Sequence, residues 1–266
     1  MSADILNQLA DHARLRVREA KEKVSFEEMK DRALQIAAAQ ESGTQFRFEK
    51  ALQGPEIGFI CECKKASPSK GLIEPDFQYL RIAREYESAG AECISVLTEP
   101  KWFLGSGDYL REIAAAVKTP CIRKDFTVDD YMIYEAKVMG AEAVLLICSL
   151  LDEKTLKDYI RTADSLGLSA LIEAHDETEI QMAVDAGARM IGVNNRNLRN
   201  FTVDIENSKR LRSLVPDGIL FVAESGIKTS NDVDMMRGAG ADAVLVGESL
   251  MRAADKTAKL KELRGL

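Results

Sequence analysis

The stretch Gly90-Ala-Glu-Cys-Ile-Ser-Val-Leu97 sets a pattern that occurs four times in this chain of 266 residues. Each copy is a Gly-Ala pair followed by an apolar run, and the copies begin at Gly90, Gly140, Gly187 and Gly240. A glycine in this place is typical of a helix end, where the backbone turns left-handed. Val, Ile and Leu crowd the runs without alternation, as in parallel strands covered on both faces. The repeat predicts helix, turn and buried strand about every 50 residues.

Each repeat holds one further strand. The apolar runs 57–64, 121–125, 168–173 and 219–224 are followed by amphipathic segments rather than tight turns. Crossovers through helices make neighbouring strands parallel. Eight such units predict an α/β protein with a closed (β/α)8 TIM barrel. The alternative is an open, doubly wound sheet, but residues 64–71 (KKASPSKG) lack the GxGxxG spacing usual after the first strand of such a sheet.

The length predicts a single domain over residues 1–266, of which 1–55 is an N-terminal helical extension. An apolar stripe at helical spacing runs through Ile5, Leu6, Leu9, Ala13 and Val17. Ser25-Phe-Glu-Glu28 predicts a capping box that opens a second helix. We expect these helices to cover one end of the barrel; a partner-binding arm is the alternative.

The charge of the chain limits its partners. A net charge of −7 argues against general affinity for nucleic acid or an anionic membrane, although a local basic pocket can still bind a small acidic ligand. No apolar run approaches the length of a membrane span, and the first 24 residues carry Asp, Glu and Arg, unlike a secretory signal. The expectation is a cytoplasmic protein with a small-molecule ligand, and a monomer is its simplest state.

Cysteine usage favours a reducing compartment. Five cysteines fall within or beside predicted strands: Cys61, Cys63, Cys93, Cys121 and Cys148. An odd number of thiols in apolar runs indicates packing rather than disulfides. Cys61 and Cys63 share one strand face, but His12 and His175 lack metal-ligand spacing, so we expect no metal site.

Charged residues interrupt the apolar strands close to their carboxyl ends. A charge inside a parallel strand is costly unless it is paired or lies at the end of the strand, and these ends form the active site of a barrel. Alternation places Glu62 and Lys64 on one face of their strand and Lys124 with Phe126 on one face of theirs. The other strand ends supply Glu173, Asn194, Arg196 and Glu224. Such a cluster suits acid and base catalysis, and an ion-pair layer that fills the barrel is the alternative.

Turns after the last two strands suit phosphate. Ser225-Gly226 and Gly247 lie where barrels often bind phosphate through backbone amides and a helix N-terminus. Glu248 is unfavourable beside phosphate, so we expect its carboxylate to point away while its backbone amide contributes.

Several ordered segments resemble the indole-3-glycerol-phosphate synthase family. They are Phe59-Ile-Cys-Glu-Cys-Lys-Lys-Ala-Ser-Pro-Ser-Lys-Gly71, Leu97-Thr-Glu99 with Phe103-Leu-Gly-Ser106, Arg123-Lys-Asp-Phe126, Leu171-Ile-Glu-Ala-His175, Gly192-Val-Asn-Asn-Arg-Asn-Leu198, Ala223-Glu-Ser-Gly-Ile227 and Val246-Gly-Glu-Ser-Leu-Met251. The resemblance covers essentially the whole chain. Because several motifs pair a rare charged strand residue with its neighbours, the joint match is far more specific than any one of them.

The resemblance implies ring closure of 1-(o-carboxyphenylamino)-1-deoxyribulose 5-phosphate to indole-3-glycerol phosphate in tryptophan biosynthesis, with loss of carbon dioxide and water and no cofactor. It assigns Lys124 as general acid, Glu173 to proton removal during dehydration and Lys64 to substrate anchoring. Glu62 and Asn194 would orient these groups, and Glu224 would bind a substrate hydroxyl. The division of acid and base roles among Lys64, Lys124 and Glu173 stays open.

The rest of the substrate also has expected partners. Phosphate would bind the amides of Ser225, Gly226 and Gly247, near Glu248, with help from Ser67 or Lys64. Arg196 would meet the carboxylate. The aromatic ring would lie among four apolar side chains, each of which is equally compatible with ordinary core packing: Phe103, Phe126, Leu145 and Leu198.

Two other functions fit a barrel with this rim. A Schiff-base aldolase would use Lys64 or Lys124 as nucleophile. A non-catalytic sugar-phosphate-binding barrel would bind without turnover. The related phosphoribosylanthranilate isomerase is disfavoured. By resemblance, that enzyme uses an acidic residue at the position where this chain has Asn194.

Overall fold

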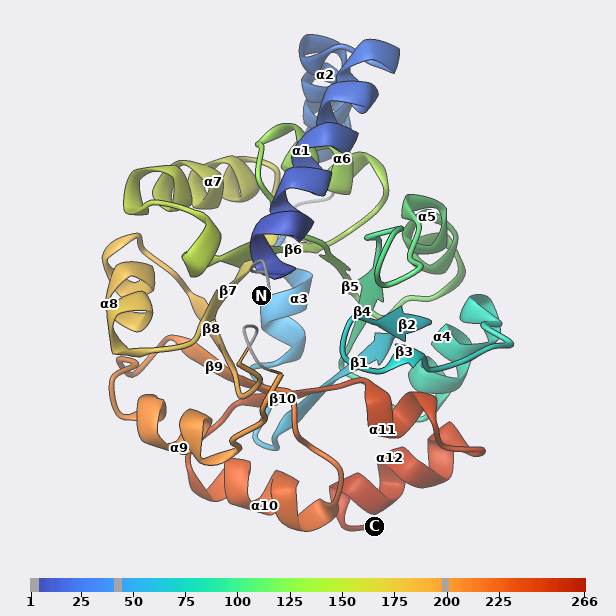
Figure 1. Ribbon diagram of the computed structural model, residues 1–266, viewed down its shortest axis with the longest axis vertical. Coiled ribbons are helices and arrows are strands. Elements are labelled where there is room, and N and C mark those ends of the chain that lie inside the picture. Colours follow the sequence, from blue (N-terminus) through green and yellow to red (C-terminus); the bar gives the residue numbers. More distant parts are fainter. Residues whose placement is uncertain (1–4, 41–44, 198–200) are drawn as a thin grey trace.

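Eight parallel strands close into a barrel in the computed structural model, which describes residues 5–40, 45–197 and 201–266 (Figure 1). Around the barrel the order is β1-β10-β9-β8-β7-β6-β5-β4, and β4 pairs with β1 to close it. The fold class expected from the repeat is confirmed, and the open-sheet alternative is wrong. The strands are β1 (Gly58–Cys63), β4 (Cys93–Leu97), β5 (Cys121–Lys124), β6 (Ala143–Ile147), β7 (Ser169–Ala174), β8 (Met190–Asn194), β9 (Leu220–Glu224) and β10 (Ala243–Val246).

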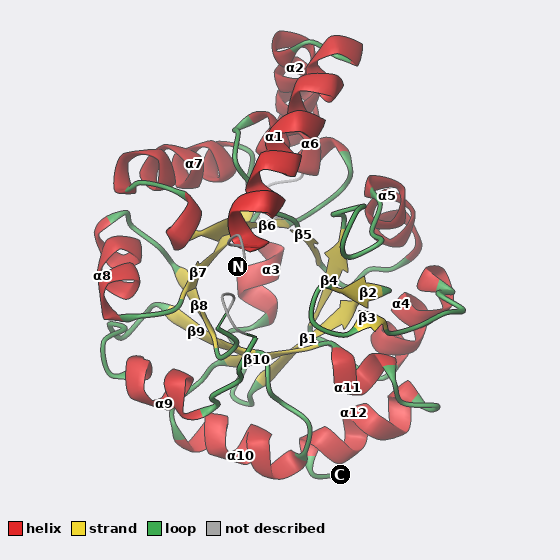
Figure 2. Cartoon of the chain, viewed as in Figure 1, coloured by secondary structure: helices red, strands yellow, loops and turns green. Residues whose placement is uncertain are grey.

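Helices form a ring outside the strands (Figure 2). They are α4 (Tyr79–Ser88), α5 (Gly107–Ala116), α6 (Tyr131–Val138), α7 (Glu153–Ser165), α8 (Glu177–Asp185), α9 (Glu206–Arg212), α10 (Ser230–Gly238), α11 (Glu248–Met251) and α12 (Lys256–Arg264), with a 3-10 turn η1 (Cys148–Leu150). The loop after β1 contains a short antiparallel hairpin of β2 (Ala66–Ser67) and β3 (Gly71–Leu72), which the sequence pattern did not predict. Among the described residues, no helix has both the length and the apolar composition that crossing a bilayer requires.

The repeated glycines end their helices as expected. Gly90 has a φ of 84°, and its N–H donates to the carbonyl of Glu87 while the N–H of Ala91 donates to that of Tyr86. This pair of hydrogen bonds is the Schellman motif, which needs a residue with left-handed backbone conformation after the helix. The same pair of bonds recurs at Gly140, Gly187 and Gly240. Each repeat therefore enters its next strand through the same turn.

Alternation along the strands separates two apolar cores. Cys61 and Cys63 point outward into the layer between strands and helices. Ile60, Ile122 and Leu171 point into the barrel. The predicted facing of β1 is confirmed, and all five cysteines are buried and unpaired.

The N-terminal helices do more than cover one end of the barrel. α1 (Ile5–Lys23) lies over the carboxyl ends of the strands, where Leu6 and Leu9 join the interior core. α2 (Phe26–Ala38) packs along α6 outside the barrel. α3 (Arg47–Ala51) closes the opposite end with Phe48, together with Leu52 directly after the helix. The extension therefore contacts both ends of the barrel and one side.

Only half of the expected capping box forms at α2. The Ser25 hydroxyl accepts the N–H of Glu28, as predicted. The Glu28 carboxylate instead pairs with Arg32 one turn later, at 2.5 Å. A salt bridge within the helix has taken the place of the return bond to the cap.

Candidate active site

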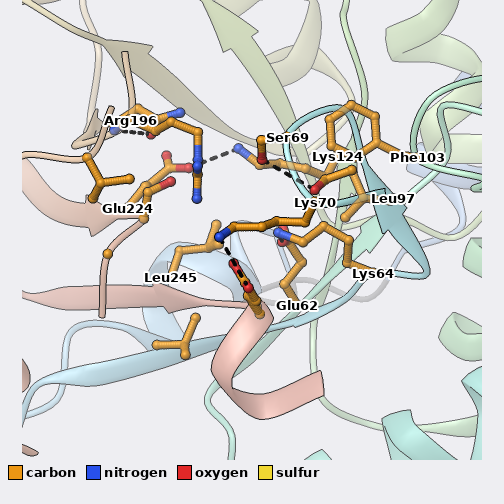
Figure 3. Close-up of a pocket in the computed structure, with 18 of the residues that line it drawn as sticks. Glu62, Lys64, Ser69, Lys70, Leu97, Phe103, Lys124, Arg196, Glu224 and Leu245 are labelled. Carbon is orange, nitrogen blue, oxygen red and sulfur yellow. Dashed lines mark hydrogen bonds and ion pairs between the residues drawn. The ribbon is translucent and has the colours of Figure 1, made fainter. Parts of the chain in front are cut away.

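A cavity of about 840 Å³ opens at the carboxyl ends of the barrel strands (Figure 3). Every site residue predicted from the sequence lines it, except Leu198, which lies outside the described residues: Glu62, Lys64, Ser67, Phe103, Lys124, Phe126, Leu145, Glu173, Asn194, Arg196, Glu224, Ser225, Gly226, Gly247 and Glu248. Side chains from all eight barrel strands or the loops after them thus reach one hollow of a size suited to a small ligand.

Lys124 lies between two buried carboxylates. Its Nζ donates to Oε2 of Glu173 at 3.0 Å and to Oε2 of Glu224 at 2.9 Å. Burial opposes the charge, but the two carboxylates raise the pKa of the Lys124 ammonium above its ordinary value. The lysine is therefore protonated and faces the cavity as an acid rather than as a free amine.

The pKa values of the two carboxylates around Lys124 are shifted in opposite directions. Burial disfavours the charge of Glu173, but Lys124 and then His175 lower its pKa below the ordinary value. Burial and the repulsion from Glu173 raise the pKa of Glu224 to about 7, although Lys124 works against the rise. Because the two pKa values are shifted in opposite directions, Glu173 is ionised and Glu224 is partly protonated near neutral pH.

Glycine at position 192 makes room for Glu224. A Cβ at Gly192 of β8 would lie 2.2 Å from Oε1 of Glu224, far inside contact distance. This Oε1 is buried and finds no hydrogen-bond partner in the part of the chain that the structure describes. An unsatisfied buried oxygen is costly, so it is available to a hydroxyl of a bound ligand.

The second lysine of the site adjoins the turn after β10. Lys64 Nζ lies 2.5 Å from Oε1 of Glu62. A Cβ at Gly247 would come within 3.0 Å of this Nζ and 2.4 Å of the Glu62 oxygen. The missing side chain thus lets the backbone before α11 approach the ammonium, and an anion at that turn would meet both.

Asn194 holds a fixed orientation through its neighbours. Its amide nitrogen donates to Oε1 of Glu173 at 3.2 Å, and its amide oxygen accepts the backbone N–H of Arg196 at 3.0 Å. Because one end of the amide meets an acceptor and the other a donor, it cannot flip without losing both bonds. Asn194 therefore links the carboxylate of Glu173 to the loop that carries Arg196.

Apolar side chains line one wall of the cavity. Phe103 and Phe126 have ring centroids 6.0 Å apart, and Leu145 lies in the same interior cluster as Phe126. Glu99, itself buried, accepts three backbone N–H groups of the loop 101–103 and so fixes Phe103. This wall matches a flat ring in size and chemistry.

Comparison with known proteins decides which barrel family this is. The family model described as indole-3-glycerol phosphate synthase matches residues 6–263. The chain belongs to this family. A protein of Ruminiclostridium cellulolyticum named indole-3-glycerol phosphate synthase is 55% identical, over 98% of this chain and 99% of that protein. One of Leuconostoc mesenteroides with the same name is 52% identical, over 91% of each chain. The resemblance found in the sequence motifs is confirmed.

Solved structures agree on the architecture of this synthase family member. A 3-hexulose-6-phosphate synthase from Salmonella typhimurium superimposes with a TM-score of 0.65 at 16% identity, covering 79% of this chain and 97% of that one. At such low identity the match supports the barrel fold alone.

Some residues of the synthase cavity escaped the sequence analysis. Ile5, Leu6 and Leu9 of α1 line it, although their stripe predicted only a cover. Lys70 reaches it from the β2-β3 hairpin, and its Nζ lies 3.8 Å from Glu248. Of these residues, only those in the apolar stripe had a signal in the sequence. That signal predicted a packed helix face, and it does not reveal whether the face borders a ligand site.

The carboxylate of Glu248 has a partner of its own. Its Oε1 accepts from Nε of Arg252, one turn along, at 3.2 Å. A carboxylate held by Arg252 and Lys70 presents less negative charge to a neighbouring phosphate. That it points away from bound phosphate stays a prediction.

Two partly buried polar contacts fix α1 over the synthase cavity. Nη1 and Nη2 of Arg16 donate to the two carboxylate oxygens of Asp125 at 2.9 and 2.6 Å, directly beside Lys124 in sequence. His12 lies 3.1 Å from Oε1 of Glu99. Burial opposes the charge of Asp125, but Arg16 lowers its pKa to about 2. The helix that carries Leu6 and Leu9 is thus tied to the end of β5, the strand that carries Lys124.

Replacing Arg16 by alanine should destabilise the fold by roughly 3 kcal/mol, because it leaves Asp125 buried without its main partner. Thr98 and Arg123 remain near Asp125 and keep the loss at the lower end of the usual range. Urea unfolding at neutral pH measures the change.

The effect of Arg16→Ala should depend on pH. The pKa of Asp125 is about 2 in the folded chain against an ordinary 3.8, so its stabilisation is full above 3.8 and disappears as pH falls through 2. The difference in unfolding free energy between wild type and Arg16→Ala should therefore become smaller as the pH is lowered from 3.8 to 2. Arg14→Ala, which removes an exposed pair on the same helix, is the control and should cost much less. A gap that stays constant down to pH 2 would exclude Asp125 as its cause.

Proposed function

We propose that this chain converts 1-(o-carboxyphenylamino)-1-deoxyribulose 5-phosphate to indole-3-glycerol phosphate, as an indole-3-glycerol-phosphate synthase, a carboxy-lyase of tryptophan biosynthesis. Family membership over nearly the full length supports the reaction. The observation that carries the site is Lys124 held between Glu173 and Glu224 at the mouth of the barrel. This arrangement supplies an acid and a base within one cavity, which a ring closure followed by dehydration requires.

Ring closure needs an acid at the substrate carbonyl. The aromatic carbon that bears the carboxylate attacks this carbonyl carbon, and electrons move to the carbonyl oxygen. Lys124, protonated and facing the cavity, would give its proton to that oxygen, and its charge would stabilise the oxygen before the proton moves. Loss of carbon dioxide from the attacking ring carbon, which bears the carboxylate, then restores the aromatic ring.

Dehydration needs a base and a leaving hydroxyl. Glu173 would remove the proton from the adjacent carbon, while the hydroxyl formed in the first step would take a proton from a cavity lysine, Lys64 or Lys124, and depart as water. The lowered pKa of Glu173 keeps it ionised for this task. Its ion pair with Lys124 places acid and base on the same few atoms of substrate.

The other cavity residues would bind and orient the substrate. Phosphate would lie at the amides of Ser225, Gly226 and Gly247, where Lys64 is close. Ser67 borders the same region, and Arg196 would pair with the carboxylate. Phe103, Phe126 and Leu145 would hold the aromatic ring, with Leu198 as a further candidate. Glu62 and Asn194 would orient Lys64 and Glu173, and Glu224 would bind a hydroxyl.

We also propose a single domain in which residues 1–55 complete the cavity, acting as a monomer in the cytoplasm. Ile5, Leu6 and Leu9 line the cavity together with the barrel residues. The acidic net charge fits this proposal.

The decisive experiment adds the deoxyribulose phosphate substrate to purified protein. We expect indole fluorescence to rise and carbon dioxide to form in equal amounts with the indole product. The Lys124→Met variant is the blank, because it keeps the side-chain length without the ammonium. Binding without any fluorescence change would instead favour the non-catalytic sugar-phosphate-binding barrel.

A further inference from the structure

His175 comes two residues after Glu173, just beyond the end of β7, and none of the roles above uses it. Its side chain is 20% exposed. The ring nitrogen Nε2 lies 3.5 Å from Oε1 of Glu173, is fully buried, and makes no hydrogen bond within the described ranges. A buried ring nitrogen that faces the proposed base requires a physical reason.

Glu179 holds the other side of this ring. Its Oε2 lies 3.1 Å from Nδ1 of His175 and accepts the backbone N–H of the same residue at 2.8 Å. Glu179 is itself fixed in the first turn of α8, because its N–H donates to Asp176, the N-cap. A carboxylate accepts hydrogen bonds, so Nδ1 carries a proton.

Charge around the ring determines the state of Nε2. Glu173 from β7 and Glu179 from α8 contact the ring, and Glu224 from β9 adds a more distant negative charge. From α9, the uncharged amide of Asn207 donates to the carbonyl of His175 at 3.3 Å. A lone pair on Nε2 would face a carboxylate oxygen, whereas a proton there would face an acceptor. Burial opposes the charge, but the bond to Glu179 and the charge of Glu173 raise the pKa of His175 above its ordinary value.

We propose that His175 is a positioning residue for Glu173: its ring, held by Glu179, presents a positively charged Nε2 to Oε1 of Glu173 and keeps this carboxylate ionised and correctly turned. The mechanistic consequence rests on the proposed function, in which Glu173 is the base. The contact between the ring and the carboxylate does not depend on that reaction.

Two cations on one carboxylate have distinct uses during the reaction. Lys124 holds Oε2 of Glu173, while Asn194 and His175 share Oε1. When Lys124 gives its proton to the substrate, it becomes neutral and no longer favours the ionised form of Glu173. His175 keeps a positive charge beside the base at that moment. The base therefore stays unprotonated until dehydration needs it.

The ring can be observed without turnover, because the chain has only two histidines, His12 and His175. Nitrogen-15 NMR of labelled histidine should show the His175 ring gaining its second proton at a pH above that of a free histidine. In Glu173→Gln and in Glu179→Gln this midpoint should fall by about one pH unit or more for each carboxylate lost. The His12 signals are an internal control and should be the same in both variants. A His175 midpoint that is unchanged in Glu173→Gln overturns the proposal, whatever reaction the protein catalyses.

Kinetics test the consequence for Glu173. His175→Gln keeps a hydrogen-bonding side chain without the charge, so the acid limb of kcat against pH should move upward by roughly one to three units while KM changes little. His175→Ala should show the same shift and also a lower plateau, because Glu173 loses an orienting contact. A wild-type profile in His175→Gln would mean that the charge has no role and would overturn the proposal. If the wild-type protein forms no indole product but the His175 midpoint shifts in the variants as expected, the proposed function alone is contradicted.

Discussion

Replacing Lys124 by alanine should lower kcat by about three to four orders of magnitude while KM changes by less than about tenfold. General acid catalysis contributes roughly 10²- to 10⁴-fold, and stabilisation of a developing oxyanion adds to it. Both effects act mainly on the transition state, so turnover should fall far more than substrate binding. Steady-state kinetics of indole formation measures the two constants.

The fold should tolerate the loss of Lys124. Its ammonium separates Glu173 from Glu224, and the pKa of Glu224 is already about 7. Without the lysine, Glu224 can take up a proton, which removes the repulsion between two buried carboxylates. Lys124→Arg is a further control, because it keeps the charge but holds its proton too tightly to donate it. If Lys124→Ala instead kept its turnover at saturation and lost only affinity, the lysine would be a binding residue.

The aldolase alternative predicts a different outcome at the same lysine. A Schiff base needs an unprotonated amine, and the two carboxylates keep the amine of Lys124 protonated. Lys64 Nζ forms an ion pair with Oε1 of Glu62. Borohydride added with substrate should leave no adduct on either lysine, as mass spectrometry of the intact protein would show.

The barrel was predictable because its physical requirements are local. Each repeat needs a left-handed turn after a helix and a strand buried on both faces, and Gly90-Ala91 with its apolar run meets both needs. Strand alternation then placed Glu62 and Lys64 inward and Cys63 outward without any coordinates. Period-two geometry is enough for this step.

Other parts of the site depend on contacts between segments far apart in the chain. Nothing in the local sequence says that Arg16 meets Asp125, since 109 residues separate them. Likewise, Gly192 is unremarkable in sequence, and only the position of Glu224 on the neighbouring strand shows why a side chain is excluded there. Such features follow from register and packing, which one sequence does not specify.

The same reason explains why the N-terminal segment was understood only in part. Its apolar stripe predicted a packed helix, and Leu6 and Leu9 are indeed buried. A stripe of this kind looks the same whether it covers a core or borders a ligand cavity. The position of α3 at the far end of the barrel could not be predicted from hydrophobic periodicity, because the helix has only five residues.

Replacing Glu173 by glutamine should lower kcat by about 10²- to 10⁴-fold and leave affinity for the substrate nearly unchanged. The amide is similar in shape and can still accept from Lys124, but it cannot take a proton during dehydration. With the charge of Glu173 gone, the pKa of Glu224 should fall below about 7, because repulsion from Glu173 is part of what raises it. Glu224 then becomes the main counter-ion of Lys124, so the fold should remain stable.

Glu224→Gln is the matched control for Glu173→Gln. Glu224 bonds the same ammonium at nearly the same distance but is assigned to a substrate hydroxyl, so its replacement should raise KM more than it lowers kcat. Affinity can be measured separately by calorimetry with the substrate whose carbonyl has been reduced to an alcohol, since this compound cannot cyclise. If Glu224→Gln lost turnover as completely as Glu173→Gln, the two carboxylates would share the base function. If Glu173→Gln kept full turnover, the proton would leave through another group, and Glu224 would then be the nearest candidate on Lys124.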